Sequence, residues 1–541
     1  MGMSESARAA RPCRLPLAWM AYVSATLKGS VLSPLTWNAW GLCIPLLLWS
    51  CLGGPSTYRS HGLEGRRIAA TAVDDRDSMH LGAADISGQV SFPGRETSPL
   101  RARHSGRHGP LTEEEMKMAR LAWKYFENNY QPDTGLVNSM HDFPSTTMWD
   151  VASYLAGLMA AAEPGIISKD EFDQRILAIL ATFNRLSFFR DELPNKVYNT
   201  KTIEKVNYVS QPGEIGFSAL DLGRLLIWLK ILKDRYPQYS DAIDRFVLRW
   251  NFCHVLDKWG TMYGAVLGPD QKTMYVQEGR LGYEEYAAKG FQLWGFNTDR
   301  ASKPEPYDVI PLYGIDVPYD ARDPRTLHAH NYVVSESYVL DALELNWDLA
   351  SDRSSDVTHH SDRWAAEFAD RIYKVQEARY RATGILTART EHQLDGPPYF
   401  VYDTVFTDGY PWNTITEDGT YVPQFAAVAL KGALGLWAIW RTEYTDLLFA
   451  TIVGLYDPQR GYYEGLYENG TGVIKAFTAN NNGIMLETLL YKVQGKLLRF
   501  SDRQSLWDKA IADQYTGAAQ CFPHRPRTMS THPDPAARSA R

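Results

Sequence analysis

The sequence predicts an all-α protein built as an (α/α)6 toroid, with β-hairpin loops on one face. Three observations lead to this prediction. About twelve segments between residues 113 and 519 have the apolar periodicity of helices. These segments alternate between a kind that is apolar nearly all round and a kind that is apolar on one side only. Short turns follow the first kind and long loops precede it, as expected if the loops gather on one face.

The first kind should form six inner helices and the second kind six outer helices. The domain begins with an outer helix, because Thr112 is a good N-cap and acidic residues follow it in the first turn. An irregular bundle and a solenoid are the alternatives, but a solenoid needs a fixed repeat length that the chain lacks. The inner segments are 147–162, 216–235, 283–296, 332–350, 421–440 and 479–496, and the outer ones are 113–129, 169–187, 239–256, 360–382, 442–455 and 501–516.

Four long loops precede inner helices, and two of them contain hairpin-like runs, GTMYGAVLGPDQKTMYVQEG and RGYYEGLYENGTGVIKAF. In the second run Asn469-Gly470 is a hairpin turn signal. Long loops on one face of a rigid scaffold are where functional sites are built. The face that carries the N-termini of the inner helices is therefore expected to hold the site. These loops span residues 188–215, 257–282, 383–420 and 456–478.

The sequence outside the helical domain predicts export. Residues 1–54 are interpreted as a signal peptide or N-terminal anchor, 55–112 as a disordered linker, 113–519 as the toroid and 520–541 as a disordered tail. Basic residues precede the apolar run TWNAWGLCIPLLLWS, whose length of about 15 residues suits a signal peptide rather than a membrane span. The run ends at Cys51, which lies in a sequence similar to a lipoprotein cleavage site. A periplasmic or secreted protein is expected, either free or tethered to the membrane at the N-terminus.

Charge and cysteine content narrow the function classes. Residues 113–519 hold 40 of the 56 basic and 55 of the 63 acidic residues, so nucleic acid and anionic membranes are poor partners and a neutral or cationic substrate fits better. No metal-ligand spacing, P-loop, dinucleotide motif, GxSxG or HExxH is present. We expect no metal and no cofactor. No disulfide framework is expected either, and Cys253 is predicted to be a core residue.

Four carboxylates near the starts of inner helices are the catalytic candidates, because paired carboxylates cleave glycosidic bonds. Glu284 and Glu285 open one inner helix, and Asp150 and Asp221 lie one turn into two others. Each also has a structural interpretation. The two glutamates could be solvated first-turn acids, and the two aspartates could be internal caps.

Further residues on the same loops and helix starts are candidates for substrate binding. The aromatic ones could stack on sugar rings and the polar ones could bind sugar hydroxyls. Alternatives remain for some of them: His330 could cap a helix, and Asp408 lies in a sequence typical of a turn. The binding candidates are Tyr283, His330, Glu336, Asp403, Asp408, Trp412, Glu464 and Tyr467.

The runs TGLVNSMHDFPSTTMWDVASYLAGLMAA, GFSALDLGRLLIWL, GYEEYAAKGFQLWG and GYYEGLYENGTG resemble the bacterial family named domain of unknown function 3131, over most of residues 113–500. A weaker resemblance is to glucoamylase-like (α/α)6 endo-β-1,2-glucanases. It implies that Asp150 is an acidic cleft residue and Glu285 the general acid. Glu284 stands where those enzymes have serine, which leaves the acid open between the two glutamates.

The sequence therefore predicts a glycoside hydrolase-like protein that cleaves a bacterial polysaccharide or β-glucan. Glu285 or Glu284 would protonate the leaving oxygen and Asp150 or Asp221 would activate water, as in an inverting enzyme. The alternative is a non-catalytic protein that binds envelope glycans or assists exopolysaccharide assembly. A polysaccharide lyase is disfavoured, because it would need a basic site for uronates.

Overall fold

A computed structural model describes residues 106–278, 280–304, 306–324, 329–510 and 521. The signal or anchor segment predicted for residues 1–54, most of the linker and most of the tail lie outside these residues. In the described part, no helix combines the length and the apolar character needed to cross a bilayer.

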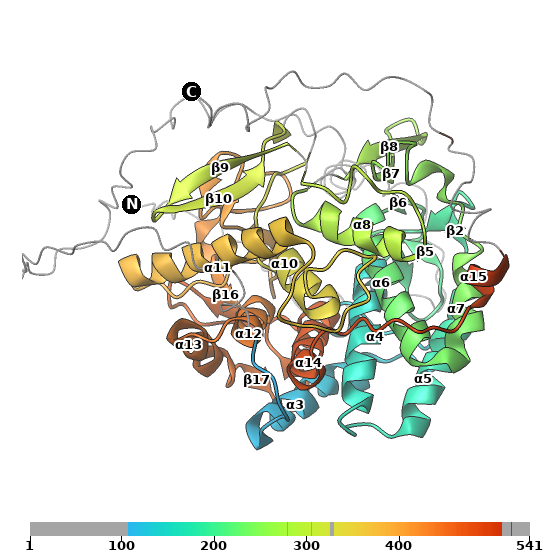
Figure 1. Ribbon diagram of the computed structural model, residues 1–541, viewed down its shortest axis with the longest axis horizontal. Coiled ribbons are helices and arrows are strands. Elements are labelled where there is room, and N and C mark those ends of the chain that lie inside the picture. Colours follow the sequence, from blue (N-terminus) through green and yellow to red (C-terminus); the bar gives the residue numbers. More distant parts are fainter. Residues whose placement is uncertain (1–105, 279, 305, 325–328, 511–520, 522–541) are drawn as a thin grey trace, which may run out of the picture. The chain divides into compact units, whose positions relative to one another are not determined.

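Six helices contact one another in cyclic order. Each packs against the next along the chain, and the last packs against the first (Figure 1). They correspond to the six segments predicted as inner helices. They are α4 (Met148–Ala162), α6 (Ala219–Arg235), α8 (Tyr283–Leu293), α10 (Glu336–Leu340), α12 (Leu430–Ile439) and α14 (Ala479–Gln494).

Side-chain caps fix where three of these helices begin. Thr147, Ser218 and Thr478 each accept a hydrogen bond from the backbone N–H three residues further on, at the starts of α4, α6 and α14. Such a cap satisfies one of the backbone donors that a helix start leaves without an intrahelical partner. It also fixes the direction in which the first-turn side chains point.

Glycine allows the closest approach between two of these helices. A Cβ on Gly290 of α8 would lie 2.0 Å from the backbone oxygen of Gly223 in α6. One on Gly223 would lie 2.5 Å from the oxygen of Ala287. The two backbones therefore pack without side chains between them, which fixes the spacing of α6 and α8.

A second set of helices packs outside the first. Helix α3 packs on α4 and α14, α5 on α4, α7 on α6, α11 on α10, α13 on α12, and α15 on α7. The predicted Thr112 cap of α3 is confirmed, with Glu115 completing a capping box. These helices are α3 (Glu113–Asn129), α5 (Lys169–Phe183), α7 (Ser240–Val247), α11 (Arg363–Thr383), α13 (Glu443–Ile452) and α15 (Leu506–Ala510).

Three helical segments differ from their prediction. In the segment 421–440, residues 421–429 contain the 3-10 turn η5 (Pro423–Phe425) and the strand β16 (Ala427–Ala429), and α12 begins only at Leu430. The segment predicted as one helix over 239–256 forms α7 and then a separate 3-10 turn, η3 (Phe252–His254), because the Asn251 side chain caps a new start. The segment 332–350 forms α10, which continues as a π-helical stretch, η4 (Asp341–Leu345). A short 3-10 turn also occurs as η2 (Pro237–Tyr239).

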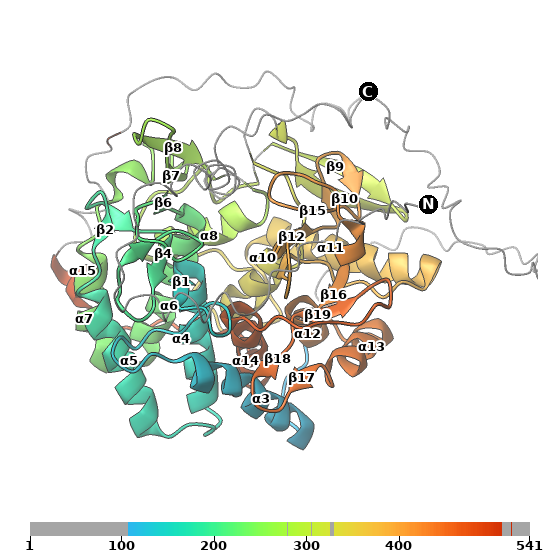
Figure 2. The same cartoon turned by 180° about the vertical axis from the view of Figure 1, so that it is seen from behind.

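All named strands lie in segments that precede one of the six inner helices, and all pair antiparallel. Most lie in the four predicted long loops. The strands outside those loops are β1 (Ser145–Thr147), β6 (Gly216–Phe217), β9 (Tyr307–Leu312), β10 (Ile315–Asp320) and β16 (Ala427–Ala429). Hairpins β7–β8 and β9–β10 lie on the same side of the helices (Figures 1 and 2). The hairpin turn predicted at Asn469-Gly470 joins β19 to β20.

Four sheets have three strands each. They are β1 (Ser145–Thr147) with β4 (Val197–Asn199) and β5 (Lys205–Val206); β6 (Gly216–Phe217) with β7 (Tyr263–Leu267) and β8 (Thr273–Gln277); β11 (His392–Gln393) with β12 (Phe400–Asp403) and β15 (Thr414–Ile415); and β16 (Ala427–Ala429) with β19 (Gly465–Tyr467) and β20 (Val473–Ile474). The two-stranded pairs are β2 (Phe188–Phe189) with β3 (Leu193–Pro194), β9 (Tyr307–Leu312) with β10 (Ile315–Asp320), β13 (Phe406–Thr407) with β14 (Tyr410–Pro411), and β17 (Tyr456–Asp457) with β18 (Gly461–Tyr462).

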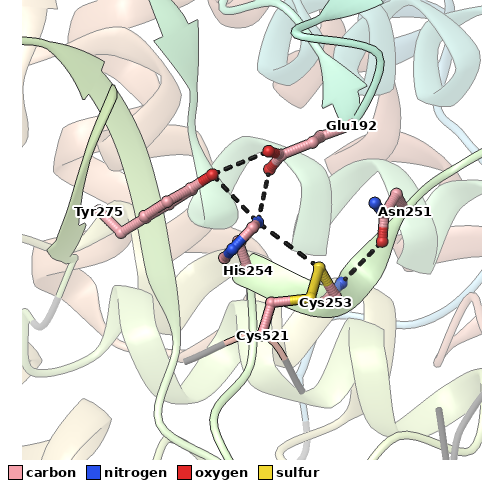
Figure 3. Close-up of a disulfide and its surroundings, with 6 residues drawn as sticks. All are labelled: Glu192, Asn251, Cys253, His254, Tyr275 and Cys521. Atoms are coloured by element: carbon pink, nitrogen blue, oxygen red, sulfur yellow. Dashed lines mark hydrogen bonds and ion pairs between the residues drawn. A yellow bond between two sulfur atoms is a disulfide. The ribbon is translucent and has the colours of Figure 1, made fainter. Parts of the chain in front are cut away.

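A disulfide joins Cys253 of η3 to Cys521 (Figure 3). The prediction that Cys253 is a core residue is therefore wrong. The two cysteines are 268 residues apart, a separation that gives no pairing signal in the sequence. Beside the disulfide, His254 and Tyr275 of β8 both contact the carboxylate of Glu192. This corner thereby connects η3 to the sheet β6–β7–β8.

The described chain begins before α3. Arg107 donates its backbone N–H to the oxygen of Ala438 (2.7 Å), and its guanidinium lies 5.0 Å from the centre of the Trp437 ring. It also pairs with Asp446 of α13 at 2.6 Å. Arg107 thus packs on the pair α12 and α13, whereas Gly109 donates its backbone N–H to the oxygen of Lys492 in α14 at 2.9 Å.

Candidate active site

The first two turns of the six inner helices place polar and aromatic side chains next to one another. We refer to these residues as the central cluster. Its members are Trp149 and Asp150 of α4, Asp221 and Arg224 of α6, Tyr283 of α8, Glu336 of α10, Lys431 of α12 and Asn480 of α14.

Asn480 connects three neighbouring helices through its side-chain amide. Its Nδ2 donates to Glu336 Oε1 at 2.9 Å. Its Oδ1 accepts from Trp149 Nε1 (3.1 Å), from Ser153 Oγ (2.9 Å) and from Arg224 Nη1 (3.0 Å). One amide therefore fixes the relative positions of side chains from α4, α6 and α10.

Arg224 forms the buried base of the cluster. Its guanidinium is fully buried and lies 4.6 Å from the centre of the Trp149 ring. Its Nη2 is 3.4 Å from Glu487 Oε2, and its Nε is 3.7 Å from Glu344 Oε1. Burial raises the pKa of both glutamates. A buried cation with two buried carboxylates fixes α6, α14 and η4 to one another.

A first acidic group, Asp150, Asp221 and Glu278, lies at the starts of α4 and α6. Asp150 Oδ2 accepts hydrogen bonds from Ser139 Oγ (2.5 Å) and Thr147 Oγ1 (2.7 Å). Burial nevertheless raises the pKa of Asp150. The residue as a whole is partly exposed.

Asp221 and Glu278 are coupled within this group. Glu278 Oε2 accepts from Ser218 Oγ (3.1 Å) and from the backbone N–H of Leu220 (3.2 Å) at the start of α6. Burial, followed by repulsion from Glu278, raises the pKa of Asp221 to about 7. The charge of Asp150 acts in the same direction. Asp221 therefore holds a proton at a pH where an ordinary aspartate has lost it.

A second acidic group, Glu336, Glu391 and Glu464, surrounds the ammonium of Lys431. Lys431 Nζ is 2.5 Å from Glu336 Oε2, and both side chains are buried. Tyr283 donates its hydroxyl to Glu391 Oε1 at 3.2 Å. Burial, followed by repulsion from Glu336, raises the pKa of Glu391 to about 7. Burial also raises the pKa of Glu464.

Aromatic rings lie between the two acidic groups. Trp149 and Tyr283 have ring centroids 5.6 Å apart, and Tyr283 and Tyr332 are 5.9 Å apart. Tyr332 in turn stacks on Tyr402 at 4.7 Å. Trp149 is the neighbour of Asp150, whereas Tyr283 bonds to Glu391. The aromatic contacts therefore connect the first acidic group to the second.

This arrangement can both give and take a proton. Asp150, Asp221, Glu278 and Glu391 are partly exposed, while Glu336 and Glu464 are buried behind them. A carboxyl that stays protonated near neutral pH can act as a general acid, and an ionised carboxylate can act as a base. Two such groups separated by aromatic side chains have the parts that glycosidic bond cleavage requires.

The two glutamates predicted as general acid lie elsewhere. Glu284 and Glu285 are 0% and 1% exposed. Glu285 accepts a hydrogen bond from the backbone N–H of Gly282 (2.6 Å), and Glu284 lies 3.5 Å from Arg322. Tyr283 takes the position toward the cluster, so the next two residues point to other faces of α8. Their catalytic role remains a prediction.

His330 and Asp408 form a pair of their own among the predicted binding residues. His330 Nδ1 lies 2.6 Å from Asp408 Oδ2, and Asp408 N bonds to Asn331 Oδ1 at 2.8 Å. The ring of His330 is 5.8 Å from that of Tyr402, which places the pair at the outer end of the aromatic contacts.

The other predicted binding residues are divided among different surroundings. Asp403 is buried and bonds to Arg389, and Trp412 lies 4.6 Å beneath the guanidinium of Arg379. Tyr467 packs against Phe425 with its ring 6.3 Å away. By contrast, Tyr283, Glu336 and Glu464 lie with Asp150 and Asp221 around the cluster. The structure thus brings together five of the predicted residues from five separate chain segments.

Several members of the site were not predicted. Arg224 and Lys431 are single charges within otherwise apolar helices, and such a charge must be paired when buried. That signal was available in LGRLLIWL and AAVALKGALG. Glu278 and Glu391 lie in loops, where the local sequence gives no comparable signal.

Solved structures with a similar fold are glucoamylase-like. One is a glucoamylase-like protein from Bacteroides caccae, with a TM-score of 0.52 and 12% identity, covering 71% of this chain and 94% of that one. Another is from Bacteroides fragilis, with a TM-score of 0.50 and 12% identity, covering 72% and 93%. An endo-β-1,2-glucanase from Chitinophaga pinensis has a TM-score of 0.49 and 11% identity, covering 72% and 94%. The first two structures confirm the glucoamylase-like fold.

The chain belongs to the family of proteins of unknown function named DUF3131, whose model matches residues 117–495. The resemblance found in the sequence is confirmed. No functionally curated protein matches the sequence.

Proposed function

We propose that this protein is a glycoside hydrolase with an (α/α)6 toroid, in which the cyclic set of six helices is the inner ring. Its substrate would be a polysaccharide or oligosaccharide. One observation carries the proposal: two acidic groups that each contain partly exposed residues lie on either side of Trp149 and Tyr283. The glucoamylase-like fold supports it, because that fold is shared with carbohydrate-related proteins.

In the proposed mechanism Glu391 is the general acid. Burial and the neighbouring Glu336 keep it protonated near neutral pH, and the Tyr283 hydroxyl holds its Oε1. Asp150 is the proposed base, since two hydroxyls hold Oδ2 and orient the group. Asp221 would assist Asp150 by accepting or returning a proton. The mechanism does not use Glu284 or Glu285, because neither is exposed to a substrate.

We also propose that the protein works outside the cytoplasm, in the periplasm or secreted. The apolar segment 36–50, which follows basic residues, supports export. The disulfide between Cys253 and Cys521 supports it independently, because disulfides form and persist mainly in oxidising compartments. Membrane fractionation of the full chain, with and without Cys51→Ser, would distinguish a free protein from a lipid-anchored one.

The test of the function is hydrolysis of a panel of neutral glucans, including β-1,2-glucan, followed by reducing-end release. Glu391→Gln and Asp150→Asn should each lower kcat at least 100-fold, because one proton transfer is lost. Glu127→Gln, on the exposed face of α3, is the matched control and should keep full activity.

The outcomes separate the alternatives. Folded Glu391→Gln and Asp150→Asn variants with unchanged activity would refute the assignment. A wild type that binds glycans without cleaving any would favour the non-catalytic glycan-binding alternative. For an active enzyme, NMR of the first-formed anomer distinguishes inversion from retention.

A further inference from the structure

Arg280 follows Glu278 by two residues in the chain and stacks on Tyr332, the ring neighbour of Tyr283. It follows β8 by three residues and precedes α8, and its guanidinium carbon is 5.2 Å from the centre of the Tyr332 ring. Stacking on an aromatic face fixes the plane of a guanidinium. The carboxylates of Glu278 and Glu391 act on its charge, one from each acidic group. Arg280 is partly exposed.

This guanidinium has no polar partner within the described chain. No carboxylate oxygen there lies within 4.0 Å of it, and none of its nitrogens makes a hydrogen bond to a described residue, although Nε is fully shielded from solvent. The other two cations of the site differ in this respect. Arg224 bonds to Ser153 and Asn480, and Lys431 pairs with Glu336.

A shielded donor without an acceptor costs free energy, typically about 1–3 kcal/mol and more for a charged group. Arginine carries five N–H donors in a planar fork and has no acceptor of its own. An unpartnered guanidinium is retained when its function outweighs this cost in stability. A guanidinium whose plane is fixed on an aromatic ring is already oriented to bind two adjacent oxygens.

We propose that Arg280 binds two neighbouring hydroxyl oxygens of a neutral sugar unit between the acidic groups. The inference rests on the proposed function and names the class of substrate. A vicinal diol presents two oxygens to the fork, and its hydroxyl hydrogens can be donated to Glu278 or Glu391. The acidic residues of both groups disfavour the added negative charge of a uronate, so the site is expected to take uncharged sugars.

A structural arginine and a binding arginine differ in what their removal does to the free protein. Loss of a structural ion pair lowers stability, as expected for Arg224. Replacement of Arg280 by methionine keeps the stacking on Tyr332 and removes the unpartnered donors. The free protein should therefore be as stable as the wild type, or more stable.

The experiment measures oligosaccharide binding by calorimetry in the inactive Glu391→Gln background, with and without Arg280→Met. A neutral oligosaccharide is compared with its uronate analogue and with a monodeoxy derivative. Arg280→Met should weaken binding of the neutral ligand 10- to 100-fold without lowering the Tm. The affinity for the monodeoxy ligand should fall by a smaller factor, because that ligand lacks one of the two hydroxyls that Arg280 is proposed to bind. Arg353→Met is the matched control, since Arg353 also stacks on an aromatic ring, Phe500, but is exposed.

Unchanged affinity in Arg280→Met, a clear fall in its Tm, or tighter binding of the uronate would each overturn the inference while leaving the hydrolase proposal intact. A folded Glu391→Gln protein and a folded wild type that bind no saccharide at all would overturn both.

Discussion

Replacing Asp221 by asparagine should change how stability depends on pH. The folded protein raises the pKa of Asp221 from its ordinary value of 3.8 to about 7, because the group is buried beside Glu278. Between these values the folded state keeps a proton that the unfolded chain has released. The free energy of unfolding therefore falls as pH rises through this range. Asparagine cannot ionise, so it removes this contribution.

The size of the effect follows from the two pKa values. One pKa unit corresponds to about 1.4 kcal/mol. Integrating between pH 5 and pH 8, Asp221 lowers the stability of the wild type by about 2.5 kcal/mol. Local relaxation around the charged group makes this an upper bound. Asp221→Asn should thus become more stable than the wild type as pH rises.

Urea unfolding at pH 5, 6, 7 and 8 measures the difference, with the slope of each transition checked for two-state behaviour. Asp241→Asn, an exposed first-turn residue of α7, serves as the control and should follow the wild type. If the free energy of unfolding of the wild type and of Asp221→Asn depends on pH in the same way, the Asp221 carboxyl is not held protonated. The explanation that burial beside Glu278 raises its pKa would then be wrong.

Two further changes test the framework of the site. Arg224→Met should lower the free energy of unfolding by about 3–5 kcal/mol, because Glu344 and Glu487 lose their buried cation. Urea unfolding at pH 7 measures this difference. An unchanged midpoint would contradict the role given to Arg224. Joint replacement of Cys253 and Cys521 by serine should cost about 2–4 kcal/mol and make the Tm independent of a dithiol reductant. If reductant leaves the Tm of the wild type unchanged, the disulfide does not stabilise the fold.

The helical framework could be predicted because its signals are local. Six apolar segments with threonine or serine at several starts predicted the inner helices. Five of the predicted starts lie within four residues of the observed ones, whereas α12 begins nine residues after the predicted residue 421. The loop lengths predicted that strands would lie in the segments before the inner helices. The break after α7 could not be predicted in this way, because the Asn251 cap interrupts a segment whose apolar pattern continues. The link to Cys521 depends on a residue at the other end of the chain.

The site was only partly predictable because side-chain direction depends on the phase of each helix. Asp150 and Asp221 each follow a hydroxyl cap by three residues, and in the structure both lie in the central cluster. Glu284 and Glu285 also open a helix, but there Tyr283 and Tyr286 face the cluster and occupy the direction that an acid would need. Glu391 lies in a loop that is distant from Lys431 in the sequence. The two side chains come together only when the chain folds.

The π-helical stretch η4 has a consequence for comparing relatives of this chain. Glu336 and Glu344 are eight residues apart, which in a regular α-helix would place them about 80° apart around the axis. A wider turn takes up roughly one extra residue, so both carboxylates face the ring interior, one toward Lys431 and one toward Arg224. A relative with an ordinary helix here should align only with a one-residue gap between these glutamates. Deleting one residue from η4 to regularise it would rotate one carboxylate out of its ion pair.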